Sequence, residues 1–371
     1  MKRFVVKNFK DNAKKYFYIQ DNENFEIVPL PSKYLKYLIE TNQSPKTVLR
    51  RARSLSYYLE YLSENELTID MVCELNFDEQ NSHFVQFLWW LKEGKHTDNE
   101  KLNQTGNGTC NAYLKDVFRF FLYATDLKYL KPLRVLSYNQ IQVSNAVGVK
   151  RSMRFQSFNG YFKAKDRNVR AAQEDEVIDI LQSCTNIRDQ LLLLLLAETG
   201  FRIGELLGID YSRDIDYQNR TIRVYFRDDN ENDSRAKNAE YRRAKVSKDS
   251  FDFLLHYISE YRGLLQHQNL LFINIAGKNA GKALREESVR DMFRRMERKT
   301  GIKLTPHMLR RYFAQTRRKE GWALELISQA LGHKHLDTTT KYLGMLDEQL
   351  LEASHEYFAR HSEIYGIKEL L

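Results

Sequence analysis

The feature that most restricts this chain is its longest apolar run, residues 191–197, with the sequence LLLLLLA. Arg188 and Asp189 precede the run, Glu198 follows it, and Gly200 comes shortly after. The run is far shorter than the roughly 20 apolar residues that a membrane-spanning helix needs. We therefore predict a helix buried inside a globular core, which ends at Gly200 because glycine readily adopts the left-handed conformation of a helix C-terminus.

Length and composition predict two folded domains. The 371 residues exceed one typical core, and the 42% hydrophobic and 12% aromatic content argues against disorder. The N-terminal segment MKRFVVKNFKDNAKKYF is basic but lacks the apolar stretch of a secretion signal. The three cysteines are scattered without C-x-x-C spacing, which argues for a reducing compartment and against a disulfide framework or a zinc site.

The charge balance indicates the class of partner. The formal net charge is +9, and such a surplus favours a polyanion, of which nucleic acid is the commonest. Charge alone does not separate DNA from RNA.

The pattern along the chain predicts a mainly α protein with a small β component. Residues 1–29 are predicted to be a small β element or arm, because they are aromatic and β-branched and contain a turn at DNEN. Residues 30–144 show helical periodicity, including a helix that starts with Ser44 as N-cap and Pro45, and another with Thr109 as a candidate cap. Residues 145–171 are expected to be a basic linker, and 172–371 to be a second, mixed α/β domain.

Two basic segments are candidate DNA-binding surfaces. They are the start of the first long helix and the beginning of the expected linker. The residues are Lys46, Arg50, Arg51 and Arg53, then Lys150, Arg151 and Arg154. An ordinary solvated helix face and a plain linker remain open alternatives.

The second domain contains several short segments with candidate chemistry. In ETGFRIGELLG, Glu205 lies one helical turn after Arg202 and is placed to hold it. Lys237 lies in a polar stretch between two expected strands, TIRVYF and RRAKVS. In LTPHMLRRYFA, Thr305 and Pro306 predict a helix start, so His307 and Arg310 share one face near exposed N–H groups that favour an anion.

The last segment is LGHKHLDTTTKYL. Gly332 is predicted to end a helix, which places His333 just beyond it. Tyr342 follows nine residues later, about one turn inside the next expected helix. Taken alone, each of these residues has an ordinary structural explanation.

Taken together and in this order, the segments resemble the tyrosine recombinase (phage-type integrase) family. The segments TGFRIGELLG, HMLRRYFA and LGHKHLDTTTKYL and their separations carry the resemblance, which covers the second domain. The preceding helical domain is similar to the core-binding domain of that family. The length, the polar stretch before AKVS and the small N-terminal element are most like the integrase-type transposases of mobile elements.

The resemblance implies a reaction and a role for each residue. Tyr342 would attack a phosphodiester to form a 3′-phosphotyrosyl link, and two rounds would pass through a Holliday junction. His307 would be the base, Arg202, Arg310 and His333 would bind the phosphate, and Lys237 would protonate the leaving 5′-oxygen. Neither a metal nor another cofactor is implied, because the protein link conserves the bond energy. The amphipathic segment 351–371 would contact a neighbouring protomer.

The resemblance also implies partners and a location. Double-stranded DNA with inverted core sites, a tetrameric synaptic complex built from free monomers, and accessory proteins are expected. No membrane partner is expected, and the location would be the bacterial cytoplasm, with the nucleoid when DNA is bound. The alternatives are an inactive architectural DNA-binding protein on the same scaffold, a type IB topoisomerase and a telomere-resolving enzyme.

Overall fold

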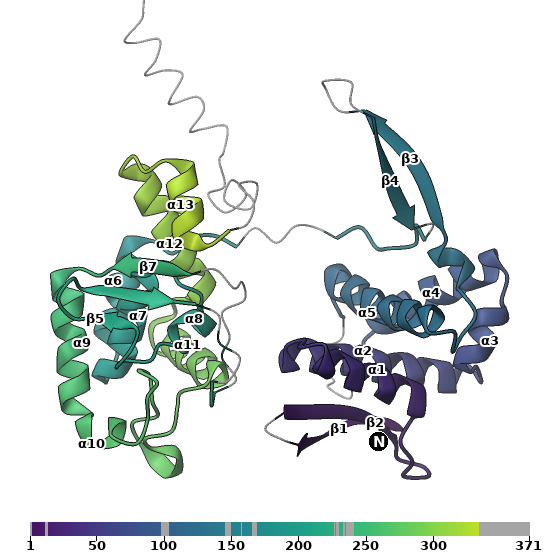
Figure 1. Ribbon diagram of the computed structural model, residues 1–371, viewed down its shortest axis with the longest axis horizontal. Helices are drawn as coiled ribbons and strands as arrows, with labels where there is room; N and C mark the ends of the chain where they lie inside the picture. The colour runs from purple at the N-terminus through teal and green to yellow at the C-terminus, as the bar shows by residue number, and fades with distance from the viewer. Residues whose placement is uncertain are drawn as a thin grey trace, which may run out of the picture. The chain divides into compact units, whose positions relative to one another are not determined.

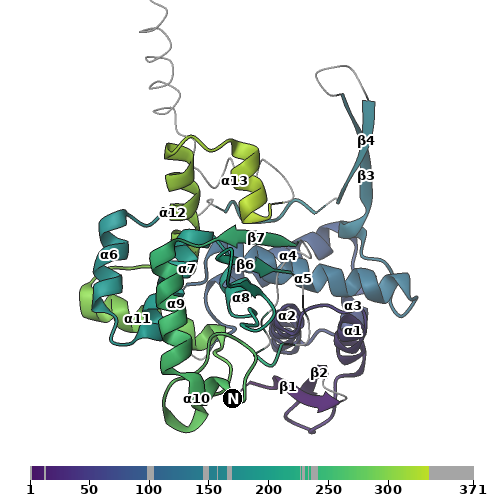
Figure 2. The same cartoon turned by 60° about the vertical axis from the view of Figure 1, so that its left-hand side comes forward.

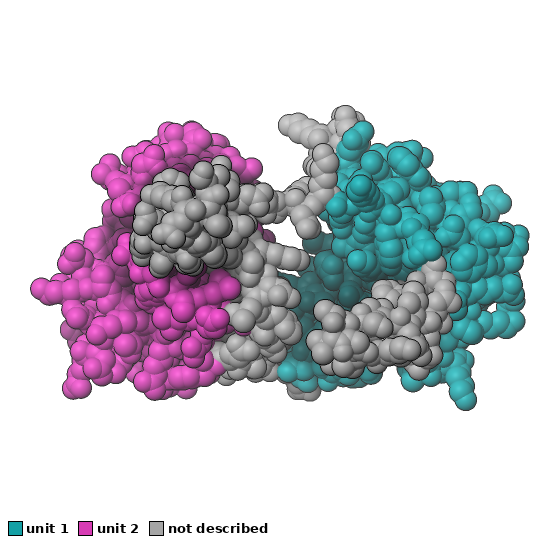
Figure 3. All heavy atoms as spheres, turned by 90° about the horizontal axis from the view of Figure 1, so that it is seen from above, with its two compact units in different colours: residues 1–167 teal, residues 168–371 magenta. Residues whose placement is uncertain are grey.

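The chain forms two compact units, residues 1–167 and residues 168–371, which Figure 3 colours separately. The structure is a computed structural model. It describes all residues except 1, 12–13, 98–103, 145–149, 157, 165–168, 226, 228–229, 233, 235–240 and 334–371. No helix in the described part of the chain is long and apolar enough to cross a membrane.

The first unit begins with an antiparallel hairpin. Strands β1 (Phe4–Asp11) and β2 (Lys14–Asp21) pair along their whole length, with Phe4 opposite Asp21. The expected turn at DNEN follows β2, and Gln20 then pairs with Ile27. Phe17 and Ile19 of β2 are buried in the core of the unit. The expected N-terminal β element is therefore packed on the helical domain, as one of its layers.

Helices make up the rest of this unit (Figure 1). They are α1 (Pro29–Glu40), α2 (Pro45–Glu64), α3 (Ile69–Glu74), α4 (Phe77–Lys92) and α5 (Asn107–Asp126), followed by the 3₁₀ turn η1 (Arg134–Leu136). Ser44 caps α2 as expected, because its hydroxyl accepts the backbone N–H of Thr47 at 3.2 Å. The cap expected at Thr109 is wrong: the N-cap of α5 is Gly106, three residues earlier.

The end of the expected helical domain and the start of the expected linker contain the two strands of a second hairpin. Strands β3 (Tyr138–Ser144) and β4 (Lys150–Gln156) pair antiparallel, with Ile141 opposite Met153. The alternation of Ile141 and Val143, and of Met153 and Phe155, is the strand signal that the many basic residues obscured. Phe158, just after β4, is buried in the first unit, so this unit extends well into the expected linker.

In the second unit, helices lie around a small sheet (Figures 1 and 2). Strands β5 (Ile215–Asp216), β6 (Thr221–Val224) and β7 (Arg242–Lys245) form an antiparallel sheet in the order β5-β6-β7. The helices are α6 (Glu174–Ser183), α7 (Ile187–Thr199), α8 (Ile203–Leu206), α9 (Lys248–Glu260), α10 (Arg262–Leu265), α11 (Glu286–Thr300), α12 (Pro306–Lys319) and α13 (Leu324–Leu331), with the 3₁₀ turn η2 (Gly277–Asn279).

The core of this unit forms around α7, the helix predicted from the apolar run. Leu191, Leu192, Leu195 and Leu196 are fully buried, and Gly200 ends the helix in the left-handed region at φ 62°. The apolar segment LLFINI, residues 270–275, forms only isolated bridges, at Leu270 and Ile273, although its composition is typical of a strand. The mainly α fold with a small β component is confirmed.

The cysteines are free thiols shielded by the fold. Cys73 and Cys110 are buried in the first unit, and Cys184 is half-buried in the second. Burial raises the pKa of Cys73 and of Cys110 to about 11, and that of Cys184 to about 12. All three thiols are therefore protonated near neutral pH.

Candidate active site

The site begins where α7 ends and α8 begins. The left-handed Gly200 turns the chain sharply, and Arg202 becomes the N-cap residue of α8. Glu205 accepts the backbone N–H of Arg202 at 2.8 Å with one oxygen and its guanidinium at 2.8 Å with the other. The predicted contact between these two side chains is confirmed.

Glu205 holds more than Arg202. Its buried carboxylate is also ion-paired with Arg242 of β7 and lies 3.9 Å from a guanidinium nitrogen of Arg310 of α12. Burial by itself would raise the pKa of Glu205. The charge of Arg242, the N–H of Arg202 and the charges of Arg310 and Arg202 outweigh it, so the pKa is lowered. One ionised carboxylate thus gathers arginines from three elements.

Arg310 is the most deeply buried of these cations, with 2% of its surface exposed. It donates to the carbonyl of Gly200 at 2.6 Å and to the carbonyl of Leu331. These carbonyls stand at the C-terminal ends of α7 and α13, where the helix dipole is negative. Arg310 therefore lies between two helix ends that attract its charge.

The end of α13 receives all three arginines. Arg242 donates to Ala330 at 2.8 Å, Arg310 to Leu331, and Arg202 to Gly332 at 3.4 Å. These are carbonyls of consecutive residues that the helix itself leaves unpaired. Figure 2 shows α13 beside α12 and above β7, the elements that supply two of the arginines. The end of α13 is thus held against the Glu205 cluster.

His333 follows directly and lies next to Arg310. Its Nε2 is 3.2 Å from a guanidinium nitrogen of Arg310. Arginine can only donate, so Nε2 accepts and the neutral ring carries its proton on Nδ1. Desolvation, followed by the charges of Arg310, Arg202 and Arg242, lowers the pKa of His333 to about 3.

His307 lies on the first turn of α12, which Thr305 caps as expected by accepting the N–H of Met308 at 3.3 Å. Desolvation is the main cause that lowers the pKa of His307, and the charges of Arg311, Arg310 and Arg202 add to it. Both histidines thus favour the neutral form near neutral pH.

The assembled groups are suited to an anion. The site contains three positive charges, on Arg202, Arg242 and Arg310, and one negative charge, on Glu205. Arg202 is the most exposed of the three arginines, with 23% of its side chain accessible. Forked guanidinium donors match the oxygens of a phosphate. The described residues contain no group of three or more side chains suited to a metal ion.

Comparison with known proteins identifies the family to which the second unit is similar. The profile of the phage integrase family matches residues 167–349. The second unit is a phage integrase family domain. Over 352 residues the chain is 28% identical to transposase A from transposon Tn554 of Staphylococcus aureus, covering 92% of this chain and 94% of the relative. Tyrosine recombinase XerA of Saccharolobus solfataricus is 30% identical over 191 residues, covering 51% and 56%.

Solved structures share the fold of this chain. The Tn1549 transposon integrase in complex with transposon right end DNA superposes with a TM-score of 0.59 at 17% identity, covering 89% of this chain and 99% of that one. A lambda integrase dimer bound to a core site gives 0.56 at 14% identity, covering 84% and 93%.

The structure brings together four of the six predicted catalytic residues of the integrase domain: Arg202, His307, Arg310 and His333. The other two, Lys237 and Tyr342, lie outside the described residues. So does the segment 351–371. Among the predicted DNA-binding residues, Lys150, Arg151 and Arg154 lie on β4, of which the structure describes the backbone.

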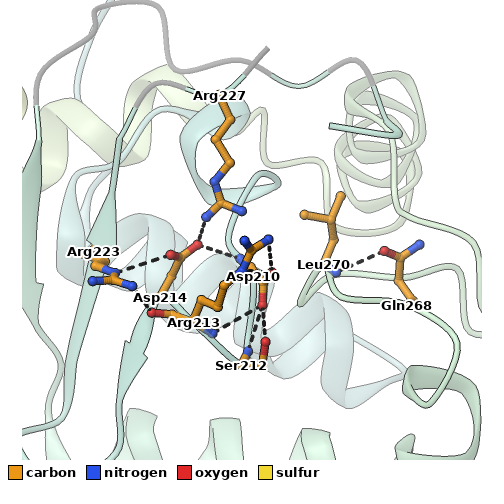
Figure 4. Close-up of polar contacts among 8 residues, drawn as sticks. All are labelled: Asp210, Ser212, Arg213, Asp214, Arg223, Arg227, Gln268 and Leu270. Carbon is orange, nitrogen blue, oxygen red and sulfur yellow. Dashed lines mark hydrogen bonds and ion pairs between the residues drawn. The ribbon is translucent and has the colours of Figure 1, made fainter. Parts of the chain in front are cut away.

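The polypeptide that leads toward Lys237 is anchored at its start by ion pairs to a buried aspartate (Figure 4). Buried Asp214 lies between Arg223, at 3.4 Å, and Arg227, with which it is ion-paired. Asp214 also accepts the backbone N–H of Asp210 at 2.8 Å. Arg223 belongs to β6 and Arg227 follows it, so the start of the β6–β7 connection is fixed to the body of the unit.

Sequence reasoning did not assign a role to Arg242. Its side chain is buried, pairs with Glu205 and stacks over Phe201 at 5.6 Å from the ring centre. Its position as the first residue of β7 was the available signal, because the side chains of a strand alternate between two faces and Arg242 and Arg243 must point oppositely. Arg242 points inward to the integrase site, and Arg243 is exposed.

Proposed function

We propose that this chain, a tyrosine recombinase that breaks and rejoins DNA, exchanges strands at the ends of a mobile element. The observation that carries the proposal is the convergence of Arg202, Arg310 and His333 at the end of α13, with a net positive charge. The relative named as a transposase and the similar integrase solved with transposon end DNA support the choice of substrate.

The arginines would bind and activate the scissile phosphate. Arg202 and Arg310 would donate to its non-bridging oxygens, and their charges would stabilise the additional negative charge of the transition state. Glu205 and the carbonyls at the end of α13 hold these side chains in place before DNA arrives, so little reorganisation is needed. His333 would add a further donor.

Proton transfer would fall to His307 and Lys237. A tyrosine hydroxyl has a pKa of about 10 and needs a base near neutral pH. The lowered pKa of His307 keeps its ring neutral and able to accept the proton of Tyr342. Lys237 would protonate the leaving 5′-oxygen, and a second 5′-hydroxyl would reverse the reaction on another strand, so the two rounds pass through a Holliday junction.

The assembly would follow from the same reaction. Each protomer would bind one inverted core site on double-stranded DNA, with residues 30–144 as the core-binding domain and 172–371 as the catalytic domain. Four protomers would form the synaptic complex from free monomers, joined through the segment 351–371. Accessory proteins and a cytoplasmic, nucleoid-associated location complete the proposal.

A suicide substrate with a nick near the crossover tests the chemistry. Incubation with the wild-type chain is expected to trap a covalent protein–DNA adduct on a denaturing gel, and Tyr342→Phe is expected to form none. Tyr312→Phe is the matched control, because Tyr312 is a half-buried packing residue of α12 and its loss should leave the adduct intact.

The other outcomes lead elsewhere. Tight binding without an adduct in the wild-type chain would favour an architectural protein. Adduct formation by Tyr342→Phe would move the nucleophile to another residue. Relaxation of supercoiled DNA without strand exchange would favour a topoisomerase.

A further inference from the structure

A second buried carboxylate, in the first unit, also holds three arginines. The side chain of Asp116 on α5 is completely buried. One of its oxygens, Oδ1, accepts Arg50 of α2 at 3.0 Å and Arg119 of α5 at 3.0 Å. Its Oδ2 accepts the hydroxyl of Ser54 at 3.2 Å. The catalytic roles proposed above do not use this cluster.

The three arginines differ in exposure. The side chains of Arg50 and Arg119 are 44% and 49% exposed, whereas that of Arg51 is 15% exposed. Arg51 lies 3.8 Å from Asp116 and donates to the hydroxyl of Tyr34 at 3.1 Å. Arg51 is thus an internal brace between α1 and α2, and the surface receives two guanidinium groups from two different helices.

The two exposed guanidinium groups are held close together. Both donate to Oδ1 of Asp116, each at 3.0 Å. The distance between the two donating nitrogens therefore cannot exceed the sum of these two hydrogen-bond lengths. One carboxylate does not neutralise three arginines, and Asp116 is the sole acidic residue between positions 107 and 125. Lys46 and Arg53 on α2 and Lys115 on α5 add exposed positive charge. The result is a basic pair that matches the span of one phosphate.

We infer that Arg50 and Arg119 together bind a single phosphate of duplex DNA, with Asp116 as the positioning residue that aims both guanidinium groups. This inference rests on the proposed function and adds a DNA contact from α5, a helix to which the sequence pattern assigned none. It also withdraws Arg51 from the surface that meets DNA. A buried anchor matters because a long side chain that is already oriented loses less rotamer freedom on binding.

The test is the salt dependence of DNA binding by the full-length chain. Binding of a fluorescein-labelled duplex carrying the element end is followed by anisotropy at several salt concentrations. Arg119→Ala and Arg50→Ala are each expected to weaken binding roughly five- to tenfold near 0.1 M salt. Because the two side chains share one phosphate, the double variant should lower the salt slope by about one, the value for one phosphate contact.

Matched variants keep the outcome interpretable. Lys131→Ala removes an exposed cation that pairs with Glu74 at 2.7 Å elsewhere in the same unit, and it should leave binding unchanged. Asp116→Asn raises the net charge by one. If Asp116 positions the arginines, this variant should bind DNA more weakly despite the added charge; tighter binding would overturn the positioning role. Circular dichroism melts confirm that each variant is folded.

Three results would reject the inference. Unchanged affinity and slope in the double variant would remove the phosphate contact, and a slope change near two would mean separate phosphates. If the double variant changes the oligomeric state of the DNA-free protein but leaves DNA binding unchanged, the two arginines would instead bind a carboxylate on a second copy of the chain. If the wild-type chain fails to bind DNA at all, the proposed function itself fails, which is a separate result.

Discussion

At the scale of single residues, His333 is defined by its neighbours. Desolvation and the arginine charges hold the ring neutral, and the contact with Arg310 places its proton on Nδ1. An unfolded histidine has its ordinary pKa of 6.5, whereas the folded value is about 3, so the unfolded chain binds more protons between these values. The stability that the neutral ring contributes is complete above pH 6.5 and is lost as the pH falls toward 3.

We therefore expect His333 to be neutral, with Nδ1 protonated, from pH 5 to 8 in the free protein. Imidazole ¹⁵N and ¹³C shifts recorded against pH, with His333→Gln to assign the resonance, would measure both properties. A titration midpoint near 6.5, or a proton on Nε2 in the absence of DNA, would contradict the arrangement at the end of α13.

At the scale of elements, a glycine at the end of α13 allows the arginines to approach. Gly332 has φ 60°, and a Cβ atom there would lie 2.7 Å from Nε of Arg242. Gly301 ends α11 in the same way at φ 75°, but a Cβ atom there would meet nothing within 4 Å. Both glycines adopt a positive φ, which other residues rarely do. Of the two, Gly332 is the one where an added Cβ atom would collide with a side chain.

Gly332→Ala should consequently destabilise the second unit more than Gly301→Ala. A left-handed alanine costs about 1–2 kcal/mol at either site, and displacing Arg242 adds a further cost at Gly332 of roughly 1 kcal/mol or more. Urea denaturation of the two variants gives the comparison. Equal losses would show that Arg242 moves aside freely, and adduct formation would then be unaffected by Gly332→Ala.

Elements with strong local signals could be predicted from sequence. Two helices begin at the expected N-caps, Ser44 and Thr305, and two end at the expected glycines, Gly200 and Gly332. These signals are readable because caps and left-handed glycines act through nearby backbone groups. The β3–β4 hairpin and the absence of a strand at 270–275 could not be predicted in this way, because whether a short strand forms depends on its pairing and packing partners.

The same distinction applies to the site. Arg202 with Glu205, and His307 with Arg310, are one helical turn apart and are visible in the sequence as pairs. Arg242 and the carbonyls of α13 are 88 residues apart or more, and no local pattern reveals their meeting. Asp116 and Arg50, separated by 66 residues, were missed for the same reason.

At the scale of the whole molecule, each unit has its own core. The first is built from aromatic residues such as Phe84, Phe87 and Phe121, and the second from the leucines of α7. No residue is shared between these two clusters. A core of this size, with its own hairpin layer, has the properties of an independently folding domain.

The fragment 1–167 is therefore expected to fold without the second unit. It should show a cooperative thermal transition and dispersed amide resonances, and it should keep the salt-dependent DNA binding assigned to Arg50 and Arg119. A fragment that lacks cooperative melting would show that the first unit depends on the second.

The three shielded thiols have a practical consequence for following this enzyme at work. Thiolate, the species that reacts with maleimide dyes, is scarce at Cys73, Cys110 and Cys184 because burial raises their pKa values. A cysteine introduced on the surface of each unit would therefore be labelled in preference to the native ones. Energy transfer between two such dyes would report whether the distance between the units changes when DNA is added, without first removing any natural cysteine.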